Sequence, residues 1–224
     1  MLEIVYNHVY KSLFFLYLIM HHLKLPDDLE VINELGVGRR SVVYLASQQD
    51  TKVVVKVYKP KYIEKYQSQY GVNIGEFEYH RNRTLFDVAC VRKYVAQPYQ
   101  LLRPQDGYSL ALVQEYVEGT LLLDLLQQLK HLPKEVLDIG YLLVKEAAKQ
   151  ELYDLDISPG NIQVLQDEAG HWYPKLYDFN LMPQYMQPPN PFMRIGFALG
   201  LRSKNYRDYR SLKDWEKRGL LAGQ

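Results

Sequence analysis

The sequence predicts an α+β protein built from two lobes, a strand-rich front lobe and a helix-rich back lobe. Two observations favour this fold class. Between Val31 and Tyr58, β-branched apolar residues alternate with polar ones, which is the period of strands. After Gly119, apolar residues recur every three or four positions, which is the period of helices. A chain of 224 residues fits one domain, or one domain with two closely joined lobes.

The front lobe is expected to hold a small antiparallel sheet and one helix. Two β-branched runs, 41–46 and 52–58, flank a polar turn and predict a hairpin. The later elements follow in order: a polar helix over 75–86, a strand over 95–102, a turn at 104–107 and a strand over 109–114.

The back lobe is expected to open with helices over 121–130 and 134–149. A second hairpin follows, over 162–165 and 172–177. The tail is expected to contain an irregular stretch over 182–191, a short helix over 191–201 and a basic helical stretch over 202–218. These elements divide the chain into an N-terminal helical extension (1–30), a front lobe (31–118) and a reduced back lobe (119–224).

The net charge and the cysteine count exclude some classes of partner and site. The 27 basic and 26 acidic side chains leave a net charge of +1, so we expect no DNA partner. The single cysteine, Cys90, excludes an internal disulfide and a cysteine-based zinc cluster. Because nothing in the chain requires an oxidising compartment, we expect the protein to be cytoplasmic.

The apolar run 13–20 is too short to cross a bilayer, and its flanking residues do not fit a secretory signal. We expect a helix over 5–23 that packs against the body of the protein. The alternative is an anchor for a partner or a membrane surface.

The first motif with chemical content is a glycine-containing stretch between two predicted strands. Gly36, Val37 and Gly38 are followed by Ser41, which stands where the fullest form of this motif has a third glycine. Residues without side-chain bulk allow the backbone to fold closely over a triphosphate. The alternative is ordinary turn chemistry.

The second feature is Lys56, which lies among valines on the strand that follows the glycine stretch. Such a lysine either carries a charge on the solvated face of the sheet or points a cation at phosphate groups while it holds a helical carboxylate. The candidate carboxylates are Glu76 and Glu78, which point to different sides of a helix, and we expect Glu76 to be the partner.

The third feature is a pair of polar loops on either side of the second hairpin. Asp156 and Asn161 lie five residues apart on one loop, and Asp178 ends the far strand. Two carboxylates and an amide can position a hydroxyl and ligate magnesium, which prefers oxygen ligands. The alternative is two ordinary surface turns.

Taken in order, these motifs and the stretch 112–119 resemble the motif series of the protein kinase superfamily, over about two thirds of the chain. The resemblance implies a two-lobed kinase-like fold that binds ATP and magnesium. It also implies a role for each matching residue: Gly36, Val37, Gly38 and Ser41 over the triphosphate, Lys56 at the phosphates with Glu76 orienting it, Gln114, Glu115 and Val117 around the adenine, Asp156 as catalytic base, and Asn161 and Asp178 as magnesium ligands.

The sequence departs from the family pattern at several positions. Asp154 and Leu155 replace the histidine and arginine before the catalytic aspartate, Ser158 replaces a lysine, and Asn180 replaces a glycine. Only 46 residues follow Asp178, and no Ala-Pro-Glu motif occurs among them. The chain therefore resembles the reduced kinases: the small kinases associated with tRNA modification, the RIO-type kinases and compact bacterial effector kinases.

The expected activity is transfer of a phosphoryl group from ATP to Ser or Thr of a protein substrate. Two alternatives stay open: a small-molecule kinase similar to the aminoglycoside and choline kinases, and a pseudokinase scaffold that binds a partner. The basic stretch 202–218 carries Tyr206, Tyr209 and Trp215. One interpretation is that it binds RNA or an acidic partner, and the other is that it forms a solvated helix with its aromatic residues packed inward.

Overall fold

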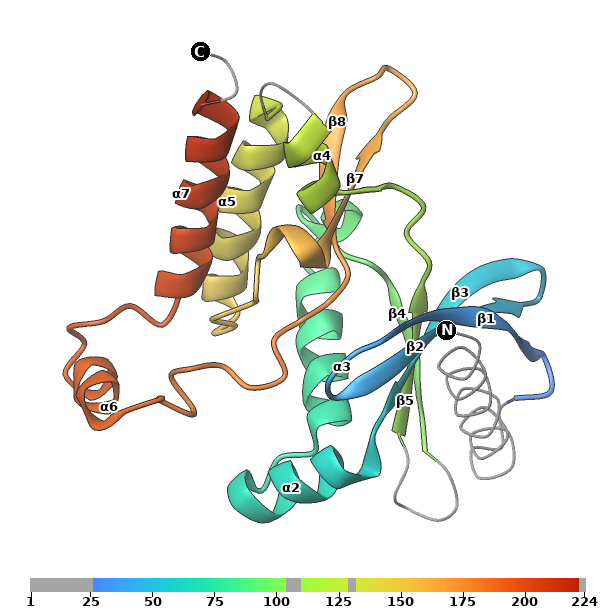
Figure 1. Cartoon of the computed structure of the whole chain (residues 1–224), viewed down its shortest axis with the longest axis horizontal. Coiled ribbons are helices and arrows are strands. Elements are labelled where there is room, and N and C mark those ends of the chain that lie inside the picture. The colour runs from blue at the N-terminus through green and yellow to red at the C-terminus, as the bar shows by residue number, and fades with distance from the viewer. Residues whose placement is uncertain (1–25, 104–109, 129–131, 222–224) are drawn as a thin grey trace, which may run out of the picture. The chain divides into compact units, whose positions relative to one another are not determined.

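The protein has an α+β fold with a five-stranded antiparallel sheet, a smaller three-stranded sheet and several helices (Figure 1). The structure is a computed structural model that describes residues 26–103, 110–128 and 132–221. The expected helix over 5–23 and the expected turn at 104–107 lie outside these ranges. Among the described helices, none is long and apolar enough to cross a membrane.

Contacts divide the chain into two compact units. The first unit contains the described residues up to Tyr79 together with Pro98–Tyr116, and the second contains His80–Gln97 and the chain from Val117 onward. Residues 80–97 therefore group with the second unit, whereas the sequence placed them in the front lobe. The physical reason is that Leu85, Val91 and Val95 are buried in the core of the second unit.

The sheet of the first unit has the strand order β1-β2-β3-β5-β4. Its strands are β1 (Leu29–Val37), β2 (Ser41–Gln48), β3 (Thr51–Tyr58), β4 (Pro98–Leu102) and β5 (Leu110–Glu115). The predicted hairpin is confirmed as β2 and β3, which pair from Ser41↔Tyr58 to Gln48↔Thr51. Gln49 and Asp50 form its turn with φ of 49° and 62°, a conformation that Asp tolerates better than most residues.

Two helices follow β3. Helix α2 (Pro60–Tyr70) was not predicted; it has Pro60 in its first turn, and Gly71, with a φ of 65°, caps its C-terminal end. Helix α3 (Ile74–Phe86) confirms the expected polar helix. It begins at Asn73, whose side-chain oxygen accepts hydrogen bonds from the backbone nitrogens of Gly75 and Glu76 at 3.1 and 3.4 Å.

The second unit contains helices and a small antiparallel sheet of order β6-β7-β8. The predicted second hairpin is confirmed as β7 (Ile162–Gln166) and β8 (Trp172–Leu176), and the two-residue strand β6 (Thr120–Leu121) was not predicted. The helices are α4 (Leu122–Gln128), α5 (Lys134–Lys149), α6 (Pro191–Ala198) and α7 (Tyr206–Leu221), with short 3₁₀ turns η1 (Arg92–Tyr94) and η2 (Pro159–Asn161). Residues 182–190 contain no helix or strand, as expected.

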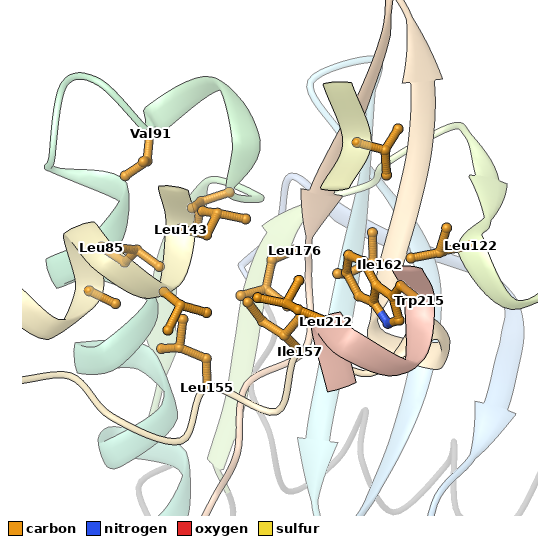
Figure 2. Packing of buried hydrophobic residues seen from close by; sticks show 14 of the residues in the cluster. Leu85, Val91, Leu122, Leu143, Leu155, Ile157, Ile162, Leu176, Leu212 and Trp215 are labelled. Atoms are coloured by element: carbon orange, nitrogen blue, oxygen red, sulfur yellow. The ribbon is translucent and has the colours of Figure 1, made fainter. Parts of the chain in front are cut away.

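One apolar core joins distant segments of the second unit (Figure 2). Leu85 of α3, Leu143 of α5 and Trp215 of α7 are all buried in it. Leu155, Ile157 and Ile162 also belong to this core, so residues on both sides of Asp156 and Asn161 are fixed by burial. The core therefore anchors the loop that carries the predicted catalytic residues.

Candidate functional site

Lys56 and Glu78 form a buried ion pair in the first unit. The Nζ atom of Lys56 lies 2.7 Å from Oε1 of Glu78, and both side chains are almost closed to water. The hydroxyl of Tyr58 donates a hydrogen bond of 2.6 Å to Oε2 of the same carboxylate. Buried charges persist only when they are paired and hydrogen-bonded, and this carboxylate has a partner on each oxygen.

The expectation that Glu76 pairs with Lys56 is wrong. Glu76 lies in the first turn of α3 and pairs instead with Arg103 at 3.0 Å, in an exposed setting. Glu78 lies four residues after the buried Ile74 and seven before the buried Leu85, so these three residues share one face of α3. That spacing is the signal in the sequence that points to Glu78 as the inward carboxylate.

The glycine stretch forms the end of the β1–β2 hairpin. Gly36 pairs with Val43, and the backbone nitrogen of Gly38 donates to the carbonyl of Ser41 at 2.9 Å. A Cβ atom added at Gly36 would meet nothing within 4 Å, so the backbone here has open space beside it. Val37 is exposed at this end of the hairpin and Ser41 is buried.

The residues expected around the adenine fall on both sides of the unit boundary. Gln114 and Glu115 end β5, where they pair with Val54 and Val53 of β3. Gln114 is buried, while Val117 begins the second unit and is also buried. The sheet thus brings Gln114 and Glu115 onto the strand beside the one that carries Lys56.

In the second unit, the loop that carries Asp156 has an unusual backbone. Asp154 and Asp156 have φ angles of 56° and 69°, in the left-handed region that non-glycine residues rarely adopt. Two such residues, separated only by Leu155, store conformational energy that the surrounding contacts must offset. Backbone strain of this kind gathers at functional sites, so the loop is a candidate for one.

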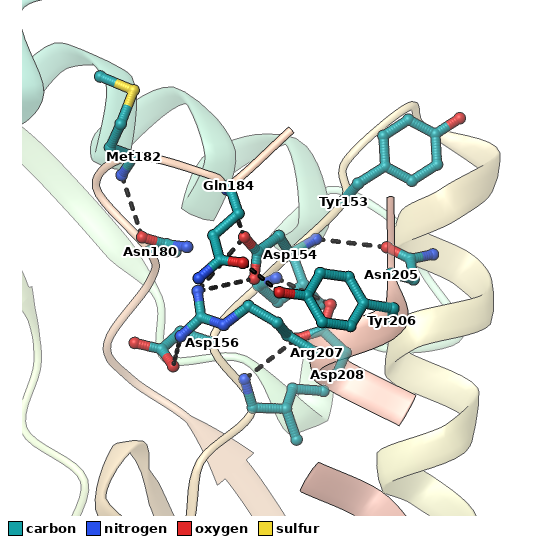
Figure 3. Close-up of polar contacts among 12 residues, drawn as sticks. Tyr153, Asp154, Asp156, Asn180, Met182, Gln184, Asn205, Tyr206, Arg207 and Asp208 are labelled. Carbon is teal, nitrogen blue, oxygen red and sulfur yellow. Dashed lines mark hydrogen bonds and ion pairs between the residues drawn. The ribbon is translucent and has the colours of Figure 1, made fainter. Parts of the chain in front are cut away.

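Asp208 of α7 holds this loop through hydrogen bonds to its backbone (Figure 3). Its two carboxylate oxygens accept hydrogen bonds from the backbone nitrogens of Leu155 and Ile157, at 3.0 and 3.3 Å. The guanidinium of Arg81 donates to the carbonyls of Tyr153 and Asp154 at 2.7 and 3.1 Å. Burial raises the pKa of Asp208 to about 6, although the two backbone donors and nearby Arg81 act in the opposite direction.

Arg207 connects the two aspartates of the loop. Its guanidinium lies 3.1 Å from Oδ1 of Asp154 and 3.6 Å from Oδ1 of Asp156 (Figure 3). Asp154 is buried, and its other carboxylate oxygen accepts a hydrogen bond of 2.7 Å from the backbone nitrogen of Gln184. Asp154 therefore links the loop to the segment that contains Gln184.

Partial burial raises the pKa of Asp156, and the charges of Asp178 and Asp154 raise it further. Arg207 and a side-chain hydrogen bond from Asn161 act in the opposite direction. A carboxylate with a raised pKa accepts a proton more readily than an ordinary surface aspartate.

Asn161 and Asp178, the residues expected to hold magnesium, carry oxygen atoms of the kind that this ion prefers. The side-chain nitrogen of Asn161 donates to the backbone carbonyl of Asp156 at 3.0 Å, which leaves the amide oxygen on the opposite side of the group. Among the described residues, no group of three or more His, Cys, Asp and Glu side chains is arranged so that it could hold a metal ion. One amide oxygen and the carboxylate of Asp178 suit magnesium, which commonly takes one or two protein carboxylates and completes its shell with water and substrate phosphates.

No protein-family model matches the chain, and no curated protein matches it.

Asn180 has a structural role in the segment after Asp178. Its backbone nitrogen donates to the carbonyl of Leu155 at 3.1 Å, and its side-chain oxygen accepts from the nitrogen of Met182 at 3.0 Å. Among the described non-glycine residues with positive φ, Asn180 does not occur. The position therefore does not need glycine. The backbone hydrogen bond of Asn180 to Leu155 connects the segment after Asp178 to the Asp156 loop.

Three residues of the site were missed by the sequence analysis as functional candidates: Asp154, Arg207 and Asp208. Asp208 lies four residues before Leu212 and seven before Trp215, so it shares the buried face of α7. An acidic residue on the apolar face of a helix is a signal that it has an inward partner. The sequence spacing does not identify the partner of Asp208, because Leu155, whose backbone nitrogen donates to it, lies 53 residues away.

Proposed function

We propose that the protein is an ATP- and magnesium-dependent phosphotransferase with a reduced protein-kinase-like fold. The observation that carries this proposal is the buried ion pair between Lys56 of β3 and Glu78 of α3. A strand lysine that follows a glycine hairpin and is oriented by a helical glutamate is the arrangement that protein kinases use to hold nucleotide phosphates. A lysine on a solvated sheet face would not be buried with a carboxylate.

The loop of the second unit supports the same reading. Asp156 is partly exposed and held by a strained backbone, while Asn161 and Asp178 supply oxygen atoms nearby. In the proposed reaction, Asp156 orients the acceptor hydroxyl and takes its proton. The bond between the acceptor oxygen and the γ-phosphorus forms as the bond from that phosphorus to the bridging oxygen of ATP breaks.

Charge stabilisation completes the mechanism. Lys56 would contact phosphate oxygens, and Glu78 fixes the position of its Nζ atom. Asn161 and Asp178 would hold magnesium, which supplies neutralisation of phosphate charge when it is bound. We propose Ser or Thr of a protein as the acceptor, with a small-molecule hydroxyl as the alternative to be tested alongside it.

The test is transfer of label from radiolabelled ATP by the full chain with magnesium. Acceptors are a cell extract and, separately, a panel of sugars, amino alcohols and aminoglycosides. The Asp156→Asn variant should lose on the order of a hundredfold or more in transfer rate, because general-base catalysis contributes that much. It should still show the magnesium-dependent thermal shift that ATP gives the parent.

Asp214→Asn is the matched control, since Asp214 is an exposed aspartate on α7. Full transfer activity in Asp156→Asn would show that Asp156 is not the base. If the parent gives neither label nor a thermal shift with ATP and magnesium, the proposal is wrong and the chain is a binding module.

A further inference from the structure

The exposed apolar residues of α6 and the turn after it support an inference that does not depend on the proposed function. Phe192, Ile195, Leu199 and Leu201 are 86%, 54%, 67% and 80% exposed. We call these four residues the apolar tip. All eight residues of α6 belong to the described chain, and none of them is buried. Large apolar side chains gathered in water indicate a surface that another surface covers.

The apolar tip belongs to a well-defined local structure. Asn190 caps α6, with its side-chain oxygen accepting a hydrogen bond of 2.9 Å from the nitrogen of Met193. Gly200 takes a φ of 68° after the last turn, and the nitrogen of Arg202 then donates to the carbonyl of Gly196 at 3.0 Å. The chain therefore folds back on α6 and places Leu201 beside the helix.

The charged residues of the segment 181–207, which contains the apolar tip, all have one sign. Arg194, Arg202 and Lys204 are exposed, and the sequence from Leu181 to Arg207 contains no acidic residue. Two of these cations lie against aromatic rings. The guanidinium of Arg202 is 4.3 Å from the ring centre of Tyr206, and Nζ of Lys204 is 4.8 Å from that of Tyr153. Apolar, aromatic and cationic side chains are thus combined in one stretch of chain.

We propose that α6 and the following turn bind the surface of a lipid bilayer that contains anionic lipids. The apolar tip would enter the boundary between headgroups and acyl chains, and Arg194, Arg202 and Lys204 would contact lipid phosphates and carboxylates. Tyrosine side chains prefer the headgroup level of a bilayer, which suits the rings beside these cations.

The shape of the segment favours a bilayer over a protein partner. Figure 1 shows α6 between two extended stretches of chain, beyond the ends of α5 and α7 of the same unit. Its contact with α7 is at the first residue of that helix, where the ring centre of Phe197 lies 6.1 Å from that of Tyr206. Its apolar side chains project from one short helix and its turn. A fluid bilayer deforms around projecting side chains, whereas a protein would need a groove of matching shape with acidic groups at its rim.

The test is sedimentation of the full chain with vesicles. One set contains phosphatidylcholine alone, and the other contains phosphatidylcholine and phosphatidylserine in equal parts. The parent protein should sediment with the mixed vesicles, bind the neutral vesicles more weakly, and lose binding as salt is added.

Two variants with matched controls locate the binding surface. Phe192→Ser combined with Leu201→Ser should weaken binding on the order of tenfold or more, because both side chains would lose their apolar environment. Ile32→Ser is the control, since Ile32 is an exposed apolar residue of β1. Arg194→Glu combined with Lys204→Glu should also weaken binding on the order of tenfold or more. Lys61→Glu combined with Lys65→Glu on α2 is its control, because both lysines are exposed.

A direct measurement of insertion uses Phe192→Trp. Brominated lipids in the mixed vesicles should quench the emission of the new tryptophan beyond any quenching seen in the parent. Sedimentation of the tip variants at the parent's level, or equal quenching in parent and variant, would overturn the proposal. So would an oligomer of the parent, formed without lipid, that the tip substitutions dissociate, because the surface would then bind a second copy of the chain.

Discussion

At the residue scale, the carboxylate of Glu78 binds two partners in a setting closed to water. Lys56 and Tyr58 both contact it, at 2.7 and 2.6 Å. Glu78→Ala would remove the counter-charge of a buried lysine, and loss of one member of such a pair destabilises a protein by about 3 kcal/mol or more. We therefore expect a marked fall in the free energy of unfolding, measured by chemical denaturation.

The matched control is Glu76→Ala. Its ion pair with Arg103 is exposed, and exposed pairs contribute less than about 1 kcal/mol. If Glu76→Ala and Glu78→Ala reduced stability equally, the assignment of Glu78 as the inward carboxylate would be wrong.

Asp208 makes stability depend on pH in a direction opposite to that of most aspartates. Its folded-state pKa is raised from 3.8 to about 6, so the folded protein binds its proton more tightly than the unfolded chain does. The stability from this group is fully present below pH 4 and is lost as pH rises through 6. The loss amounts to about 3 kcal/mol, because one pKa unit corresponds to about 1.4 kcal/mol.

The measurement compares the parent with Asp208→Asn, which cannot titrate at this position. The free energy of unfolding of the parent minus that of the variant should fall as pH rises from 4 to 7. A difference that stays constant over this range would contradict the raised pKa.

At the element scale, α5 and α7 approach each other closely at Gly140. A Cβ atom added there would lie 2.6 Å from Cδ2 of Leu212 and 3.1 Å from Cζ3 of Trp215, and both of these side chains are fully buried. Overpacking of this kind costs about 1–3 kcal/mol, which outweighs the gain of roughly 1 kcal/mol in helix propensity. Gly140→Ala should therefore lower the melting temperature.

Gly196→Ala is the matched control for this substitution. The nearest atom to its added Cβ is Cβ of Arg202 at 3.6 Å, an ordinary contact. Here the propensity gain should dominate and the melting temperature should stay the same or rise slightly. Only Gly140→Ala is thus expected to lower the melting temperature, and an unchanged or raised melting temperature for Gly140→Ala would show that α5 and α7 pack differently.

Elements with a strong local pattern were predictable from the sequence, and elements defined by distant contacts were not. The β2–β3 hairpin follows from alternation around a polar turn, and α5 follows from its apolar spacing. Helix α2 buries only Ile63 and Tyr66, so its apolar pattern is faint, and the two-residue strand β6 exists only through its pairing with β7.

The candidate site also contains residues that local motifs predict and residues that only distant contacts define. Lys56, Asp156, Asn161 and Asp178 stand out by residue type and spacing within short motifs. The choice between Glu76 and Glu78 depended on which face of α3 turns inward. The roles of Arg207 and Asp208 depend on the folding of α7 against a loop some fifty residues earlier, and no local pattern encodes that contact.

At the scale of the whole molecule, the second unit depends on contacts between segments that are far apart in the chain. Its core joins Leu85, Leu143 and Leu176 with Leu212 of the last described helix. The backbone nitrogen of Ala96 donates to the carbonyl of Leu176 at 2.8 Å, so the segment 92–96 is fixed to β8 over the same core. A substitution that weakens the packing of α7 should therefore lower the stability of the whole unit.

Leu212→Ala tests this dependence, because it removes a fully buried side chain and should cost about 2–5 kcal/mol. Hydrogen exchange followed by mass spectrometry should show faster exchange in α7, in β8 and in the segment 92–96 alike, since these share one cooperative unit. Lys213→Ala, at an exposed position one residue further along α7, should leave exchange unchanged. Faster exchange confined to α7 in the Leu212→Ala protein would mean that the helix docks on a core that is already complete without it.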